Sequence, residues 1–216
     1  QLGWIAIVRG EYERAERICA EALETARATG DDWITFGVLG NYAGAVIELG
    51  DIPRARALLE ESLAAVRRVG DLRNVSNALC NLGWAALVDG DPEAALPLLE
   101  ESLHVATELG DVIQLPSVFH LLGMQANDVG DHARAEEVLR EGLATGKGLG
   151  ERHQVAETLA ELARALVARA PDEAAEALAA AEALYAELGV QPPPRDQERT
   201  ERTRAAIAAA QVTRAG

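Results

Sequence analysis

Glycine recurs every 20 residues along most of the chain, and this spacing constrains the fold more than any other feature. The recurring positions are Gly10, Gly30, Gly50, Gly70, Gly90, Gly110, Gly130 and Gly150, and an Asp or Glu follows each of them. Glycine tolerates the left-handed backbone conformation that closes a helix. An acidic residue at the next position can bind the free N–H groups of the following helix and oppose its dipole. Each pair therefore predicts the end of one helix and the start of the next.

The segments between these turns have the apolar spacing of amphipathic helices, as in Leu58, Leu59, Leu63 and Val66. No segment alternates apolar and polar residues in the way a half-buried strand does. Each predicted helix has about 17 to 18 residues, roughly 26 Å. Because the connections are short, neighbouring helices must run antiparallel. The sequence therefore predicts a series of helical hairpins.

Small residues repeat in two columns at intervals of 40 residues, and larger apolar residues stand beside each column. The small columns are Gly3, Ala43, Gly83, Gly123, Ala163 and Ala15, Ala55, Ala95, Ala135, Ala175. The large columns are Leu2, Tyr42, Leu82, Leu122, Leu162 and Ile18, Leu58, Leu98, Val138, Leu178. We expect the small residues to let two helices approach and the large ones to fill the space between successive hairpins. One hairpin cannot bury its apolar face alone, so stability must come from stacking.

The spacing of a small residue, a Gly-Asp turn and an alanine resembles the tetratricopeptide repeat. The pattern is complete at Gly83, Gly90, Asp91, Ala95 and again at Gly123, Gly130, Asp131, Ala135. It departs from that repeat in its length of 40 residues instead of about 34, and Leu59 and Leu99 stand where an aromatic residue is common. The long period and the sequence GDPEAALPLLEESLHVATELGD at residues 90–111 resemble the C-terminal helical arrays of large ATP-binding bacterial transcriptional regulators of the LuxR type.

This resemblance, which covers roughly residues 1–190, implies an all-α fold: a right-handed α-α superhelix (α-solenoid) of about five hairpins plus a C-terminal capping helix. The predicted repeats are residues 1–30, 31–70, 71–110, 111–150 and 151–189. Pro192, Pro193 and Pro194 then break the chain, and residues 191–216 hold the predicted cap, for which a frayed tail is the alternative. The first turn glycine comes early and no methionine begins the chain, so we expect a longer protein around it.

Charge and composition limit the partners. The chain has 20 basic and 35 acidic residues, a net charge of −15, which opposes binding to nucleic acid or anionic lipid. No apolar run approaches the roughly 20 residues of a membrane span, and the first residues, Gln1 to Trp4, do not resemble a signal peptide. Cys19 and Cys80 fall at apolar positions of the repeat, so we expect two buried thiols in a cytoplasmic protein. Neutral, apolar or basic partners are expected.

No residue pattern indicates catalysis, a metal or a cofactor. The segment from Gly142 to Gly148 is one residue short of a phosphate-binding loop and no Ser or Thr follows Lys147, so its glycines favour close helix packing. His104, His120, His132 and His153 lack metal-ligand spacing. The paired glutamates, such as Glu60 and Glu61, predict solvated faces, and Ser62 and Ser102 predict small packing residues. We therefore expect no enzyme.

The first helices of successive hairpins are expected to line a concave groove, as in other helical arrays. The candidate binding residues are Trp4, Trp33, Arg73, Asn77, Asn81, Trp84, Ser117, His120, Met124, His153, Glu157 and Arg164. Trp4 and Trp84 flank Gly44 in one column, which predicts either a notch walled by two indoles or packing residues. Asn77, Asn81 and Arg73 are suited to bind the backbone of an extended peptide. Pro97 and Pro116 are predicted inside helices, where a missing N–H kinks the axis.

These features predict a non-catalytic domain that binds a protein or peptide segment, or a small effector, in its groove. It would serve as a sensor or scaffold in a larger bacterial regulator. The alternative is a structural spacer or a self-association module that forms a homodimer. Solution mass and ligand-dependent melting separate the two.

Overall fold

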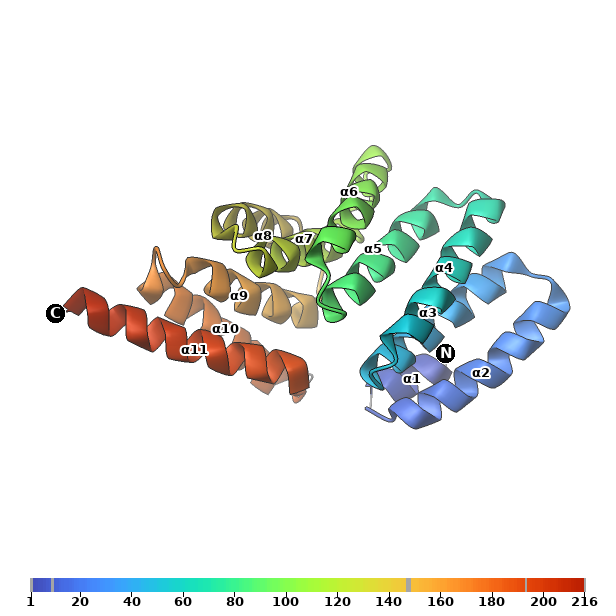
Figure 1. The fold of residues 1–216 in the computed structure, drawn as a ribbon, viewed down its shortest axis with the longest axis horizontal. Coiled ribbons are helices and arrows are strands. Elements are labelled where there is room, and N and C mark those ends of the chain that lie inside the picture. The colour runs from blue at the N-terminus through green and yellow to red at the C-terminus, as the bar shows by residue number, and fades with distance from the viewer. Residues whose placement is uncertain (1, 9, 147–148, 193, 216) are drawn as a thin grey trace. The chain divides into compact units, whose positions relative to one another are not determined.

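The computed structural model describes residues 2–8, 10–146, 149–192 and 194–215, and within them the chain forms eleven helices and no strand (Figure 1). The helices are α1 (Leu2–Val8), α2 (Tyr12–Thr29), α3 (Asp32–Glu48), α4 (Ile52–Val69), α5 (Leu72–Val88), α6 (Pro92–Glu108), α7 (Leu115–Asp128), α8 (His132–Gly146), α9 (Arg152–Leu166), α10 (Pro171–Leu188) and α11 (Pro194–Ala215). The predicted all-α fold of helical hairpins is confirmed.

The turns have the predicted chemistry. All eight periodic glycines, and Gly189, have positive φ angles between 60° and 86°. The side chains of Asp31, Asp51, Asp71, Asp91 and Asp131 accept hydrogen bonds from backbone N–H groups at the starts of α3, α4, α5, α6 and α8. The cap prediction is wrong at Glu11 and Glu151, whose side chains make no such bond. Glu11 instead binds Arg14, because its longer side chain reaches outward along the helix.

The helices group into two compact units, residues 1–110 with α1 to α6 and residues 111–216 with α7 to α11. In the N-terminal unit α3 pairs with α4 and α5 with α6, while α2 lies against α3 and α4 against α5. In the C-terminal unit α7 pairs with α8 and α9 with α10, and α8 also lies against α9. The final helix, α11, lies against α10 and α9. The predicted repeat and domain boundaries remain predictions.

Leucines on the second helices explain the small residues on the first helices. A Cβ atom added at Gly83 would lie 2.5 Å from Cδ2 of Leu99, and one added at Gly123 would lie 2.3 Å from Cγ of Leu139. Leu59, Leu99 and Leu139 are almost completely buried. The predicted column one residue earlier is only half-buried at Ile18, Leu58 and Leu98. The core leucine is therefore the one that faces the small residue across the hairpin.

Two further details differ from the repeat pattern. Helix α10 begins at Pro171, one residue earlier than the period requires, so Ala174 is fully buried and the predicted Ala175 is only half-buried. Pro97 lies inside α6 as predicted. Pro116, however, lies in the first turn of α7, where a missing N–H costs no helical hydrogen bond. The prediction of a kink at Pro116 is therefore wrong.

Several predicted packing roles agree with the structure. Cys19 and Cys80 are buried free thiols, and burial raises the pKa of Cys19. Ser62 and Ser102 are buried between helices. A Cβ at Gly142 would lie 2.9 Å from Cβ of Phe119, which is the close approach of α8 to α7 expected there. Lys147 and Gly148 lie outside the described residues.

The paired glutamates form surface ion pairs between second helices. Glu61 lies 2.6 Å from Arg27, and Glu101 lies 2.9 Å from Arg67. All four side chains are substantially exposed, so each pair contributes at most about 1 kcal/mol. Among the described residues, no helix combines the length and the hydropathy that a membrane span requires.

Candidate functional site

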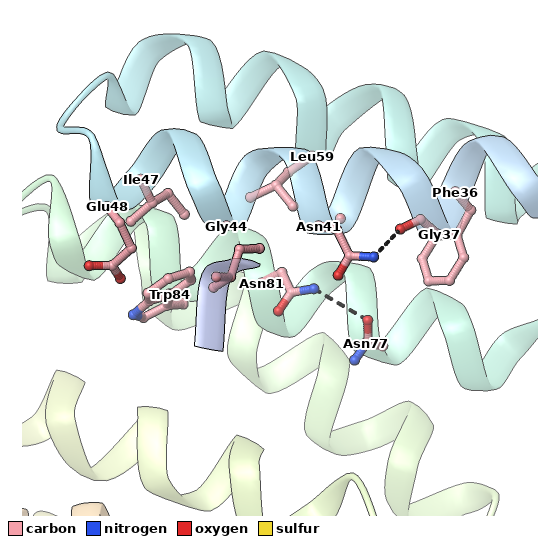
Figure 2. A pocket seen from close by; sticks show the side chains of 12 residues that line it. Phe36, Gly37, Asn41, Gly44, Ile47, Glu48, Leu59, Asn77, Asn81 and Trp84 are labelled. Carbon is pink, nitrogen blue, oxygen red and sulfur yellow. Dashed lines mark hydrogen bonds between the residues drawn. The ribbon is translucent and has the colours of Figure 1, made fainter. Parts of the chain in front are cut away.

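The N-terminal unit contains a groove of about 350 Å³ between α3 and α5, with α1 and α4 contributing one residue each (Figure 2). It is lined by Ile7, Phe36, Gly37, Gly40, Asn41, Gly44, Ile47, Glu48, Leu59, Asn77, Asn81 and Trp84. Figure 2 shows Phe36 and Gly37 at one end and Glu48 and Trp84 at the other. The groove therefore follows the parallel course of two first helices.

Three glycines open the α3 side of this groove. Gly37, Gly40 and Gly44 are spaced by three and four residues, which places them on one face of the helix. Among the described residues, a Cβ atom added at Gly37 or Gly40 would have no neighbour within 4 Å, and one at Gly44 would lie 3.8 Å from Cδ1 of Ile7. Glycine inside a helix costs about 0.5–1 kcal/mol relative to alanine. Helix packing does not require these glycines, and their effect is an open surface.

Asparagine amides supply the polar groups of the groove. Nδ2 of Asn41 donates to the carbonyl oxygen of Gly37 at 3.0 Å, and Nδ2 of Asn81 donates to Oδ1 of Asn77 at 3.3 Å (Figure 2). Since a backbone carbonyl can only accept, the first bond fixes the orientation of the Asn41 amide. Within the described part of the chain, no group donates a hydrogen bond to Oδ1 of Asn41 or of Asn81. These two oxygens are available as acceptors.

The end of the groove at Glu48 is acidic. Glu48 lies in the last turn of α3, and half-buried Trp84 lies in the last turns of α5. A helix C-terminus carries a partial negative charge of about half an electron. Among the described residues that line the groove, Glu48 is the only one with a charged side chain.

Of the candidate residues predicted in this unit, the structure brings Asn77, Asn81 and Trp84 together in the groove. Trp33 is 62% exposed and Arg73 is also exposed, and neither belongs to the lining. The side chain of Trp4 lies outside the described part of the structure, so the notch of two indoles remains a prediction.

Phe36, Asn41 and Glu48 are among the lining residues that were not predicted as binding residues from the sequence. Asn41 follows Gly37 by four residues and Glu48 follows Gly44 by four, so both lie on the helical row beside the glycines. This four-residue spacing is the sequence signal from which Asn41 and Glu48 could have been predicted as lining residues. Phe36 directly precedes Gly37 and has no such spacing.

Two candidates of the C-terminal unit, His120 and Met124, are not on an open groove. They are 9% and 6% exposed, because α9 packs against this part of the unit. Nδ1 of His120 lies 3.4 Å from Oγ1 of Thr158 on α9. Burial lowers the pKa of His120, which favours the neutral ring. The structure therefore corrects the expected exposure of both side chains.

The candidate Arg164 belongs to a charge network that includes buried Glu161. Nη1 of Arg164 lies 2.7 Å from Asp128 and 3.4 Å from Glu161, and Nη1 of Arg199 on α11 lies 2.9 Å from Glu161. Asn127 also donates to Glu161 at 3.0 Å. Burial by itself would raise the pKa of Glu161, but the neighbouring arginines hold it below the ordinary value. The sequence did not predict Glu161 as the shared partner of Arg164 and Arg199.

The other three candidates of this unit also contact their own unit. Nδ1 of His153 lies 3.6 Å from Glu157, and its ring meets Tyr185 edge-on at 5.7 Å between centroids. Burial raises the pKa of Glu157. Ser117 donates to Gln154 at 3.2 Å. In the part of the chain that is described, no three His, Cys, Asp or Glu side chains converge on a metal-binding position.

Comparison with known proteins identifies the type of repeat. Residues 34–108 match a family model described as tetratricopeptide repeat, and residues 116–141 match a second model with the same description. Tetratricopeptide repeats are generally non-catalytic modules for protein–protein interaction or scaffolding. The chain is thus a tetratricopeptide-type helical repeat protein in fold. A search of the curated proteins found no match.

Solved structures of the same fold cover most of the chain. A candidate kinesin light chain of Podosopora anserina with nearly identical TPR-like repeats has 21% sequence identity and a TM-score of 0.63, over 87% of this chain and 93% of that one. BtubC (BKLC) from P. vanneervenii has 21% identity and a TM-score of 0.64, over 96% and 78%. A double mutant of MamA RS-1 has 21% identity and a TM-score of 0.55, over 87% and 92%. Identities this low establish the fold alone.

Proposed function

We propose that the chain is a protein-binding module that holds an extended segment of a partner protein in the groove between α3 and α5. The observation that carries this proposal is the face of Gly37, Gly40 and Gly44, which is open although packing does not require it. It lies opposite the amides of Asn77 and Asn81 across the groove.

The dimensions and chemistry of the groove support an extended segment. Ligand sites of proteins are usually about 300–1,000 Å³, and this groove of about 350 Å³ would hold a few residues of a chain. Side-chain amides can bind the backbone N–H and C=O groups that an extended peptide leaves unpaired. Phe36 and Trp84 offer aromatic contacts at the two ends, and buried aromatic residues commonly carry much of the affinity of an interface.

A substitution that fills the groove with a side chain tests the proposal. Peptides are selected on the whole chain from a random ten-residue library, and their affinity is then measured for the Gly40→Gln variant. Because a side chain at Gly40 points into open space, this variant should fold normally and lose at least tenfold in affinity. Ala64→Gln, on an exposed position of α4, adds a similar side chain outside the groove and should bind normally. Undiminished binding by Gly40→Gln would refute the proposal.

We also infer a sensor or scaffold role within a larger bacterial regulator, for which the sequence resemblance of residues 90–111 is the support. The complete open reading frame tests it, since a nucleotide-binding domain and a DNA-binding domain should flank the repeats. The competing prediction of a self-association module is tested by solution mass. A mass that rises to a dimer with concentration, without any peptide binding, would favour that alternative.

A further inference from the structure

The last helix of the C-terminal unit, α11, lies against α9 and α10 (Figure 1). The surface that it covers, called here the α9–α10 face, includes Glu161, Val167, Asp172 and Glu182. Arg204 of α11 lies 2.5 Å from Glu182, and Gln211 donates to Asp172 at 2.9 Å. Later residues of α11 therefore meet earlier residues of α10, and the two helices run antiparallel.

Helix α11 buries few of its side chains, although it has 22 residues. Among those described between Arg195 and Arg214, only Thr203 and Ile207 are buried. The 17-residue α5, a first helix within the N-terminal unit, has ten buried residues. Because hydrophobic stabilisation grows with the apolar area removed from water, burial holds α11 in place much less firmly than α5.

The packing of α11 against α9 also leaves space. A cleft of about 440 Å³ lies beside the two helices, and its lining includes Val167 and Ala168 of α9 and Ala206 of α11. Ala206 has only a methyl group to place in this cleft. A helix with a larger apolar side chain at the same position would bury more of the α9–α10 face than α11 does.

The buried carboxylate of Glu161 requires a cation from the helix that covers it. Glu161 is 5% exposed, and Nη1 of Arg199 lies 2.9 Å from it. Its other arginine, Arg164, lies 3.4 Å away and also pairs with Asp128 at 2.7 Å. Loss of one partner of a buried charge is strongly unfavourable. The covering helix must therefore supply a basic side chain where α11 supplies Arg199.

We propose that α11 is a displaceable occupant of the α9–α10 face, which binds an amphipathic helix of a partner protein in its place. The positions of Arg199, Thr203 and Ile207 define that helix: a basic, a small and a large apolar residue at successive intervals of four. A further large apolar residue takes the place of Ala206. This surface does not involve the groove between α3 and α5, so its failure would leave the proposed function standing.

A fluorescein-labelled peptide with the sequence of residues 194–215 tests the proposal by fluorescence anisotropy with the whole chain. Aspartate at buried position 207 weakens the attachment of the chain's own α11. The peptide should therefore bind the Ile207→Asp chain at least tenfold more tightly than the unaltered chain. The control chain, Ala209→Asp, carries the same charge at an exposed position of α11 and should bind like the unaltered chain.

Variants of the peptide test the recognition pattern on the Ile207→Asp chain. An Arg199→Met peptide should bind at least tenfold more weakly, because it leaves Glu161 without this partner. An Ala206→Leu peptide should bind about threefold to tenfold more tightly, because it fills the cleft beside Val167. Equal binding by the Arg199→Met peptide would overturn the role of Glu161, and no gain from Ala206→Leu would overturn the role of the cleft.

Hydrogen exchange tests whether α11 can leave while the rest of the unit stays folded. In the unaltered chain, the amides of residues 203–210 should exchange at least tenfold faster than those in the middle of α10. Ile207→Asp should accelerate exchange in α11 and leave α10 protected. Equal exchange of the two helices, or loss of protection in α10 of the variant, would show that α11 is an integral part of the fold and overturn the proposal. Equal peptide binding by the Ile207→Asp and Ala209→Asp chains would overturn it as well.

Discussion

Glycines inside two neighbouring first helices should respond in opposite ways to the same substitution. At Gly40 an added Cβ has no neighbour within 4 Å, so Gly40→Ala gains only the helix preference of alanine. We expect the free energy of unfolding to rise by about 0.5–1 kcal/mol. At Gly83 the same Cβ would lie 2.5 Å from Cδ2 and 2.7 Å from Cγ of Leu99, which is completely buried.

The Gly83→Ala variant gains the same helix preference but must displace Leu99. Forcing an extra group into a filled core costs about 1–3 kcal/mol. The expected net result is a loss of about 1–2 kcal/mol, opposite in sign to Gly40→Ala. In a chain that also carries Leu99→Ala, the obstructing atoms are absent, so Gly83→Ala should become stabilising.

Urea unfolding followed by tryptophan fluorescence reports on the N-terminal unit, because Trp4, Trp33 and Trp84 all belong to residues 1–110. Midpoints should move at unchanged m values if only stability changes. A lower midpoint for Gly40→Ala would mean that its glycine serves the fold, and the argument for an open binding surface would fail. A stabilised Gly83→Ala variant would refute the account of the hairpin core.

Three further predictions concern buried or half-buried polar groups. Arg199→Met should cost the C-terminal unit about 1–3 kcal/mol, measured by hydrogen exchange in α9 and α11, because it removes a partner of buried Glu161. Glu157→Gln should stabilise the chain at pH 7 and have little effect below pH of about 4. The pKa of Glu157 is raised in the fold, so its stabilising protonated form is lost as the pH rises, and unchanged behaviour between these pH values would contradict this. Ser76→Ala and Ser102→Ala should each cost about 1 kcal/mol in urea unfolding. Each hydroxyl donates to the backbone carbonyl oxygen of the other serine, and the two hydroxyl oxygens lie 3.0 Å apart. The double variant should cost less than the sum of the single variants, because either single variant already removes the contact between the hydroxyls.

The hairpins were predictable because their signals are local. A turn glycine and the aspartate after it determine the end of one helix and the cap of the next within four residues, as at Gly30 and Asp31. The start of α7 was not predictable from the same signal. Asp111 does accept hydrogen bonds from the N–H groups of Ile113 and Gln114, but the helix begins only at Leu115. Pro116 is placed in its first turn instead of its interior.

The candidate site was predictable only in part, because exposure depends on which helix covers a face. Asn77, Asn81 and Trp84 were found from their column, and the groove beside them is open. Met124 lies 40 residues after Trp84, at the equivalent position of α7, yet packing against α9 buries it. The partners Glu161 and Arg199 are 38 residues apart in the sequence, and only the position of α11 brings them together.

The inner faces of the two units show different uses of the same repeat. In the C-terminal unit, Glu161 and Arg164 on α9 are bound to partners within the unit, including Arg199 of α11. In the N-terminal unit, the three groove glycines together forgo about 1.5–3 kcal/mol of helix stability. That is a large share of the 5–15 kcal/mol by which a domain is usually stable. A surface that is left open at such a cost, beside the acceptor oxygens of Asn41 and Asn81, supports the proposal that a ligand binds there.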